Sequence, residues 1–216
     1  NSDQTVLVAS YVADLTGLGG GAATVFASGF LDDSQGPGFG LYVALGGATT
    51  TAPALQLQPF APTAKLQVIH NAADPAASSV DVYVNGSLAI PGFDFRDATP
   101  FIDLPAGVPV EVEITPAGNP TVVYSLNLDS LQQNTNYIAI ANGVLTPANF
   151  TANPDAVSIG FDLYINGQGR LVGQNGSSDV DVLVFHGATD APTVDVVARG
   201  VGTLIDDLSY TDFQGY

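Results

Sequence analysis

Short runs of alternating apolar and polar residues recur along this chain and predict β-strands. The runs are rich in Val, Ile and Tyr, which favour half-buried strands, and every second residue of such a strand faces the same side. The turn-forming residues between them include 24 Gly and 14 Pro. No stretch of three or four turns carries the sustained apolar stripe of a helix. The pattern therefore predicts an all-β protein.

The middle of the chain predicts one complete β-sandwich of two antiparallel sheets. Its strands are expected at residues 65–70, 79–84, 101–104, 108–115, 122–128, 137–141 and 161–165, with a hairpin turn at Asn85-Gly86. Further strands are expected at residues 5–12 and 179–185. Positions that alternate within these strands should face the core: Val68, Val80, Val82, Val110, Val112, Ile138, Ile140, Phe161 and Leu163.

The chain also repeats itself. The run from Val68 to Asp74 returns as Val184 to Asp190, and residues 26–31 return as residues 140–145. The two offsets, 116 and 114 residues, indicate one Ig-like module of about 115 residues that occurs in tandem.

The ends of the chain fall inside this repeat. Residues 1–60 are expected to be the C-terminal half of one module, residues 61–176 a complete module, and residues 177–216 the N-terminal half of a further one. Neither half should be stable alone, because each would expose an apolar face and open strand edges. The halves are complementary: the alignment places Asn1 near Ala117 and Tyr216 at Phe101, so a sandwich rebuilt from both would lack about one strand.

Composition excludes several classes of partner. Four Lys and Arg against 21 Asp and Glu give a formal net charge of −17, which repels nucleic-acid phosphates and anionic lipid surfaces. Nucleic-acid binding is therefore not expected, and membrane insertion is not expected because the sequence has no run of 18 apolar residues. A polar but weakly charged surface suits a protein outside the cell or on its surface. The chain has no Cys for disulfides and no Met, so we expect its start and any secretion signal to have been removed or to lie upstream.

The only two histidines occupy equivalent positions of the repeat. His70 is followed four residues later by Asp74, and His186 by Asp190. Each pair could be a metal site or an acid–base couple. One His per module offers too few ligands for zinc, which favours a structural role in which the His bonds the following loop and the Asp caps its turn.

Other aspartates offer a weaker signal. Asp81 and Asp195, in the repeated Val-Asp-Val triplets, complete the structural motif. No cofactor is expected, although adjacent aspartates at Asp32-Asp33 and Asp206-Asp207 leave calcium as an alternative. No nucleophile elbow, phosphate-binding loop or zinc-protease helix motif is present, so the chain is not expected to be an enzyme.

The repeated motifs resemble a known family. Residues 68–75 with residues 80–86, followed by Leu104-Pro105-Ala106-Gly107 and Thr115-Pro116-Ala117-Gly118, are similar to the domain of unknown function family 4397. The second copy departs from the pattern at residues 197–200. The resemblance implies a tandem β-sandwich module of bacterial surface and secreted proteins, commonly called adhesion-related, with no established catalytic residues.

Two functions fit these observations. The first is a structural extracellular protein: a subunit or repeat segment of a filament, stalk or adhesin, in which copies of the chain join head-to-tail through complementary half-modules. The alternative is a cell-surface adhesion module that binds a carbohydrate or a protein without polymerising. The absence of Trp weakens the second hypothesis, because exposed aromatic loops are its expected signature.

Overall fold

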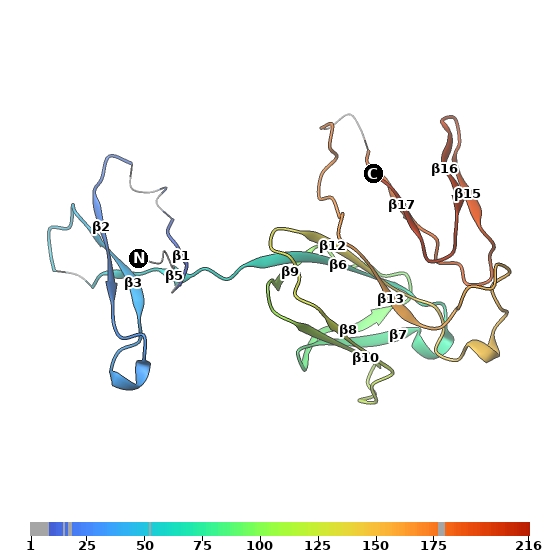
Figure 1. Cartoon of the computed structure of the whole chain (residues 1–216), viewed down its shortest axis with the longest axis horizontal. Coiled ribbons are helices and arrows are strands. Elements are labelled where there is room, and N and C mark those ends of the chain that lie inside the picture. Colours follow the sequence, from blue (N-terminus) through green and yellow to red (C-terminus); the bar gives the residue numbers. More distant parts are fainter. Residues whose placement is uncertain (1–8, 15, 17–18, 52, 177–179) are drawn as a thin grey trace, which may run out of the picture. The chain divides into compact units, whose positions relative to one another are not determined.

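The computed structural model describes residues 9–14, 16, 19–51, 53–176 and 180–216, and these residues form an all-β protein, as predicted (Figure 1). The 3-10 turns whose bounds the structure describes have three residues each: η2 (Asp33–Gln35), η3 (Pro75–Ala77) and η4 (Pro147–Asn149). No helix in the described ranges is long and apolar enough to cross a membrane. The chain divides into two compact units, Asn1–Ala61 and Pro62–Tyr216.

The second unit contains a module of two four-stranded sheets. One sheet has the strand order β11-β10-β7-β8, and the other β13-β12-β6-β9. The bounds are β6 (Thr63–Asn71), β7 (Ser79–Val84), β8 (Ser87–Asp94), β9 (Ile102–Pro105), β10 (Val110–Pro116), β11 (Tyr124–Leu128), β12 (Asn136–Asn142) and β13 (Asp162–Asn166).

One strand pair departs from the antiparallel expectation. Strands β6 and β12 run parallel, with Val68 opposite Ala139, whereas their other neighbours in the sheet are antiparallel. Parallel neighbours need a long connection. The chain between β6 and β12 contains all four strands of the other sheet, so it is long enough to return to the end of the sheet where β6 began.

Strand β8 was not predicted from the sequence. Its residues include Pro91-Gly92, which interrupt the alternation of apolar and polar positions. Proline removes a backbone donor and is tolerated where a strand lies at a sheet edge. Strand β8 is such an edge strand, because it pairs only with β7, and its register there shifts after Val80 and Val82.

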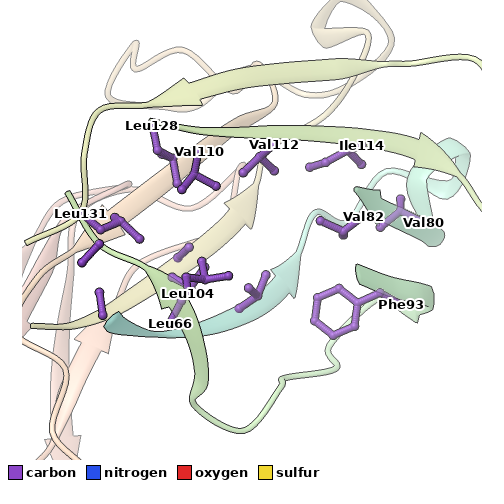
Figure 2. Packing of buried hydrophobic residues seen from close by; sticks show 14 of the residues in the cluster. Leu66, Val80, Val82, Phe93, Leu104, Val110, Val112, Ile114, Leu128 and Leu131 are labelled. Atoms are coloured by element: carbon purple, nitrogen blue, oxygen red, sulfur yellow. The ribbon is translucent and has the colours of Figure 1, made fainter. Parts of the chain in front are cut away.

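The core lies between the two sheets. Figure 2 shows Val110, Val112 and Ile114 of β10 pointing toward Leu66 and Leu104 of the facing sheet. Burying a side chain of this size contributes about 1.5–3 kcal/mol. Of the expected core positions, Val68, Val80, Val82, Val110 and Val112 belong to this cluster, and Phe161 and Leu163 pack against it.

The expected orientation of Ile138 and Ile140 was wrong. Both side chains are buried, but they lie on the outer face of their sheet, where they line a groove with Leu183 and Phe185. Their neighbours Ala139 and Ala141 face the core instead. The strand is apolar on both faces because both are covered, and such a run does not reveal its register.

Residues 180–216, the C-terminal segment, cover that outer face. They contain β14 (Leu183–Phe185), β15 (Val194–Ala198), β16 (Gly202–Leu208) and β17 (Phe213–Gly215). Within the described residues, β14 pairs only with β17, and β15 only with β16. The segment therefore consists of two separate two-stranded sheets packed in the same compact unit as the module.

The N-terminal unit holds a three-stranded sheet, β2-β3-β4, and a two-stranded sheet, β1-β5. The bounds are β1 (Tyr11–Val12), β2 (Ala23–Ser28), β3 (Gly40–Leu45), β4 (Leu55–Gln56) and β5 (Gln58–Pro59). Residues 5–8 of the expected strand 5–12, and residue 179 of the expected strand 179–185, lie outside the described residues, as does residue 1.

A glycine-dependent turn occurs in both units. Phe30 bridges Gly38 in parallel in the N-terminal unit, and Val144 bridges Gly160 in the module. The glycines that precede these bridges, Gly29 and Gly143, have φ of +92° and +94°. A side chain at either glycine would collide with the carbonyl of the bridging glycine, so both positions require Gly.

Candidate functional site

His70 is buried at the end of β6, with 1% of its surface exposed. Its Nε2 lies 2.7 Å from the carbonyl oxygen of Ala77, and its Nδ1 accepts a hydrogen bond from the amide of Ala72. The rings of Phe93 and Phe95 lie beside it. Burial lowers the pKa of His70 below its usual 6.5. The ring therefore holds the loop after β6 closed as a neutral side chain.

Asp74 connects this loop to the second half of the module. Its carboxylate caps η3 by accepting from the amide of Ala76, and it accepts a second hydrogen bond from the amide of Leu145 at 2.8 Å. Asp74 is 5% exposed. The His-loop-Asp motif is thus fixed at both ends, and one end depends on the residues that follow β12.

His186 repeats the local geometry of His70. Its Nε2 lies 2.9 Å from the carbonyl oxygen of Pro192, and its Nδ1 accepts from the amide of Ala188. Its backbone also bonds Thr211 and Asp212, as that of His70 bonds Arg96 and Asp97. Asp190, however, is exposed, and no other residue in the described part of the chain donates a hydrogen bond to its carboxylate. The partner that corresponds to Leu145 is not part of this segment.

The two Val-Asp-Val aspartates also differ. The carboxylate of Asp81 accepts from the amides of Gly92 and Gly118, at 2.7 and 3.1 Å, and these bonds lower the pKa of Asp81. Asp195 accepts from the amide of Asp207 at 3.0 Å. Gly118 lies beyond β10, a strand that has no counterpart in the C-terminal segment. The motif is therefore complete only where the later strands are present.

The two pairs of adjacent aspartates proposed as calcium ligands differ in their surroundings. Asp195, Asp206 and Asp207 are exposed and place carboxylate oxygens within 4.8 Å of one another. A hydrogen bond with Asp195, together with the charges of Asp195 and Asp207, raises the pKa of Asp206. Proximity alone does not make a cation site, since exposed acidic groups often lie together without one.

The adjacent pair Asp32 and Asp33 forms an ordinary turn instead. Asp32 caps η2, where its oxygens accept from the amide and hydroxyl of Ser34 and from the side chain of Gln35. These bonds occupy the carboxylate within its own turn.

A buried polar junction joins the module to the C-terminal segment. Asn142, with none of its surface exposed, lies 3.0 Å from the hydroxyl of Tyr210 and 2.8 Å from the side chain of Asn71. Tyr210 is 2% exposed, and burial raises its pKa to about 12. A Cβ at Gly187 would overlap the side chain of Asn71, so the chains approach closely here.

Two further side chains support this junction. Asn153 donates to the carbonyls of Thr189 and Ala191, and Asp155 accepts from the amide and hydroxyl of Thr193. None of these residues was predicted from the sequence as functional. The sequence signal for such a junction was a polar residue at the end of an apolar strand, as at Asn142. The same pattern also occurs where a strand simply ends in a turn.

These observations define a cysteine-free, all-β protein with a module of two facing four-stranded sheets. The chain belongs to the family described as Domain of unknown function (DUF4397), whose sequence profile matches residues 64–171. That range begins in β6 and ends after β13, so it corresponds to the module. No curated protein matches the chain.

Proposed function

We propose that this chain is a structural extracellular protein, built from tandem Ig-like repeats of about 115 residues, that assembles head-to-tail into a filament, stalk or adhesin at the cell surface. The contact joins the C-terminal segment of one copy to the N-terminal unit of the next. Together these two parts rebuild a module.

The observation that carries this proposal is a difference in burial between aligned residues. Val68, Val80 and Val82 are at most 9% exposed in the module. The aligned Val184, Val194 and Val196 are only half-buried. The C-terminal segment thus has the apolar face of a module core without the strands that cover such a face in residues 62–176.

The N-terminal unit has the complementary content. Its β2 and β3 align with β12 and β13, which complete the module core. The side chains of β2 that correspond to the core-facing Ala139 and Ala141 are exposed: Val25 is 53% exposed, and Ala27 is also exposed. Each part therefore presents the apolar surface that the other part would cover.

Such a contact propagates. The two surfaces differ and lie on different parts of the chain, so the association is heterologous and continues into a ring or an open filament instead of stopping at a dimer. The same contact would operate between successive chains or between successive segments of a longer polypeptide. An extracellular location is consistent with the low charge density of 12%.

Concentration-dependent assembly tests this function. Negative-stain microscopy and analytical ultracentrifugation of the 216-residue chain should show particles with an axial repeat that grow with concentration. Val196→Asp should abolish this growth by placing a charge on the apolar face. Val201→Asp, at a position 78% exposed in the β15–β16 turn, is the matched control and should assemble normally. A monodisperse monomer at millimolar concentration would contradict the proposal.

One observation favours the alternative of a binding module. A groove of about 470 Å³ lies between the outer face of β6 and β12 and the C-terminal segment. Its lining includes Asn71, Phe185 and Tyr216, a mixture of amide and aromatic groups that suits a sugar, and its volume falls in the range of small-ligand sites. Saturable binding of an oligosaccharide by a chain that stays monomeric, abolished by Tyr216→Ala, would favour this function over assembly.

A further inference from the structure

We propose that β14 is the docking strand of the assembly and that it takes β2 of a second copy as a parallel neighbour, with Val184 opposite Val25. This inference rests on the proposed head-to-tail function and assigns its partner strand and register.

The backbone of β14 has one edge in use and one open. His186 donates from its amide to Asp212 and accepts at its carbonyl from Thr211, and Val182 accepts from Tyr216. Because backbone groups alternate between the two edges of a strand, those of Leu183 and Phe185 point to the other edge. No strand among the described residues pairs there. An open edge of this kind accepts an added strand.

The register follows from the module. There β6 pairs in parallel with β12, with Val68 opposite Ala139 and His70 opposite Ala141. The sequence repeat aligns Val68 with Val184 and Ala139 with Val25. Carried over, the pairing places Val184 opposite Val25 and His186 opposite Ala27.

The side chains fit this register. In the module, His70 and the small residues Ala139 and Ala141 line the same small core cavity, of about 40 Å³. Ala27 keeps a small residue opposite His186, and Val25 would cover the half-buried Val184. A shift by one residue would turn Phe26 into the core and Val25 away from it, because alternate residues of a strand face opposite sides.

The surface continues an interface that already exists in the chain. A groove of about 510 Å³ runs from Phe95 and Arg96 of the module to His186, Val194 and Leu208 of the C-terminal segment. It therefore begins at the junction with the module and extends to the half-buried Val194, next to the buried His186 and Leu208. A second copy is the occupant that fits, because its β2 is the segment of this sequence that aligns with β12, the strand that lies beside β6 in the module.

Cysteine pairing tests the register, and the chain has no native Cys to interfere. Val25→Cys and Val184→Cys are combined in one chain, which is assembled and then oxidised so that neighbouring thiols form disulfides. Neighbouring strands lie about 4.8 Å apart, a spacing that a disulfide can bridge. The expected product is a ladder of covalent oligomers under denaturing conditions. Val68→Cys with Ala139→Cys is the positive control and should link within one chain.

The outcomes separate the register from the function. Phe26→Cys with Val184→Cys, shifted by one residue, should give at least tenfold less ladder. Filaments in the microscope without a Val25–Val184 ladder, while the positive control links, would overturn the register and leave the proposed function standing. No assembly of the unmodified chain would overturn both. A link confined to single chains would show that the two ends pair within one copy and would overturn the proposal.

Discussion

The module and the C-terminal segment both carry the His-loop-Asp motif, but the hydrogen bonds of the motif differ between the two copies. His70 and His186 make the same bonds to the loop that follows them, with Nε2 at 2.7 and 2.9 Å from a loop carbonyl. Asp74 accepts a hydrogen bond from the amide of Leu145, in the loop after the neighbouring strand β12, whereas Asp190 is exposed. The local geometry of the histidine loop, including the burial of the ring, therefore forms without the later strands, whereas the buried hydrogen bond of the aspartate does not.

The aspartates of the two Val-Asp-Val triplets differ in the same way. The carboxylate of Asp81 accepts hydrogen bonds from two backbone amides, one of them that of Gly118 beyond β10. The carboxylate of Asp195 accepts one hydrogen bond, from the amide of Asp207. Its hydrogen bond to Asp206 and its charge raise the pKa of Asp206. The C-terminal segment therefore has an aspartate motif with fewer hydrogen bonds than that of the module, and its Val184, Val194 and Val196 are only half-buried. In the proposed assembly, the strands of a second copy would cover these residues.

The largest expected effect is at the completed histidine. His70→Ala removes a buried ring and leaves the Ala77 carbonyl without its partner, so we expect a loss of about 3 kcal/mol in the free energy of unfolding. His186→Ala in the dilute chain should cost less, about 1 kcal/mol, because the ring of Tyr210 packs against His186 where two rings pack against His70. Urea denaturation monitored by tyrosine fluorescence measures both. Equal losses would show that the later strands add nothing to this motif.

Mutations at the junction between the module and the C-terminal segment should cause the next largest loss of stability. Tyr210→Phe removes the hydroxyl that meets buried Asn142 and should cost about 1–3 kcal/mol. Gly187→Ala should loosen the C-terminal segment by a comparable amount, because the added methyl overlaps Asn71. Ala188→Gly, at an exposed neighbouring position, is the control. Limited proteolysis should release residues 180–216 faster in both junction variants; unchanged cleavage would argue against the junction.

The strands could be predicted from local alternation of apolar and polar residues, whereas the junction between the module and the C-terminal segment could not. Alternation along β6, β7 and β10 reveals one buried face of each strand. Strand β12 is buried on both faces, so Ile138 and Ile140 gave no information about which face was inward. Asn142 and Tyr210 lie far apart in the sequence, and only the packing of the C-terminal segment on the module brings them together.

A smaller effect is expected from pH. The pKa of His70 is lowered in the folded state, although Asp94 and Asp97 oppose this, so the unfolded chain binds the proton more readily. Its contribution to stability is complete above pH 6.5 and declines as the pH falls from 6.5 toward the lower folded pKa. The stability that Asp81 contributes through its lowered pKa is fully present above 3.8 and is lost only as the pH falls below that value. His70→Gln should flatten the pH dependence between 7 and 5; an unchanged slope would contradict this assignment.

The smallest expected effect concerns ions. The described N-terminal unit contains no Lys or Arg, and the C-terminal segment is rich in Asp, so the two proposed contact surfaces repel each other. Raising NaCl should strengthen assembly by screening that repulsion. Calcium at matched ionic strength should do no more than NaCl if Asp195, Asp206 and Asp207 act only as surface charges. A calcium effect at micromolar concentration, lost in Asp206→Asn, would instead identify a specific site.

Amide hydrogen exchange tests most directly whether the C-terminal segment is an uncompleted half-module. The amides of Gln67 and Ile69 face β12 and should be protected at every protein concentration. Those of Leu183 and Phe185, at the aligned positions of β14, should exchange readily in the dilute chain. They should become protected as concentration rises and assemblies form. Protection of Leu183 and Phe185 in dilute monomers, or continued exchange in fully assembled material, would contradict the account.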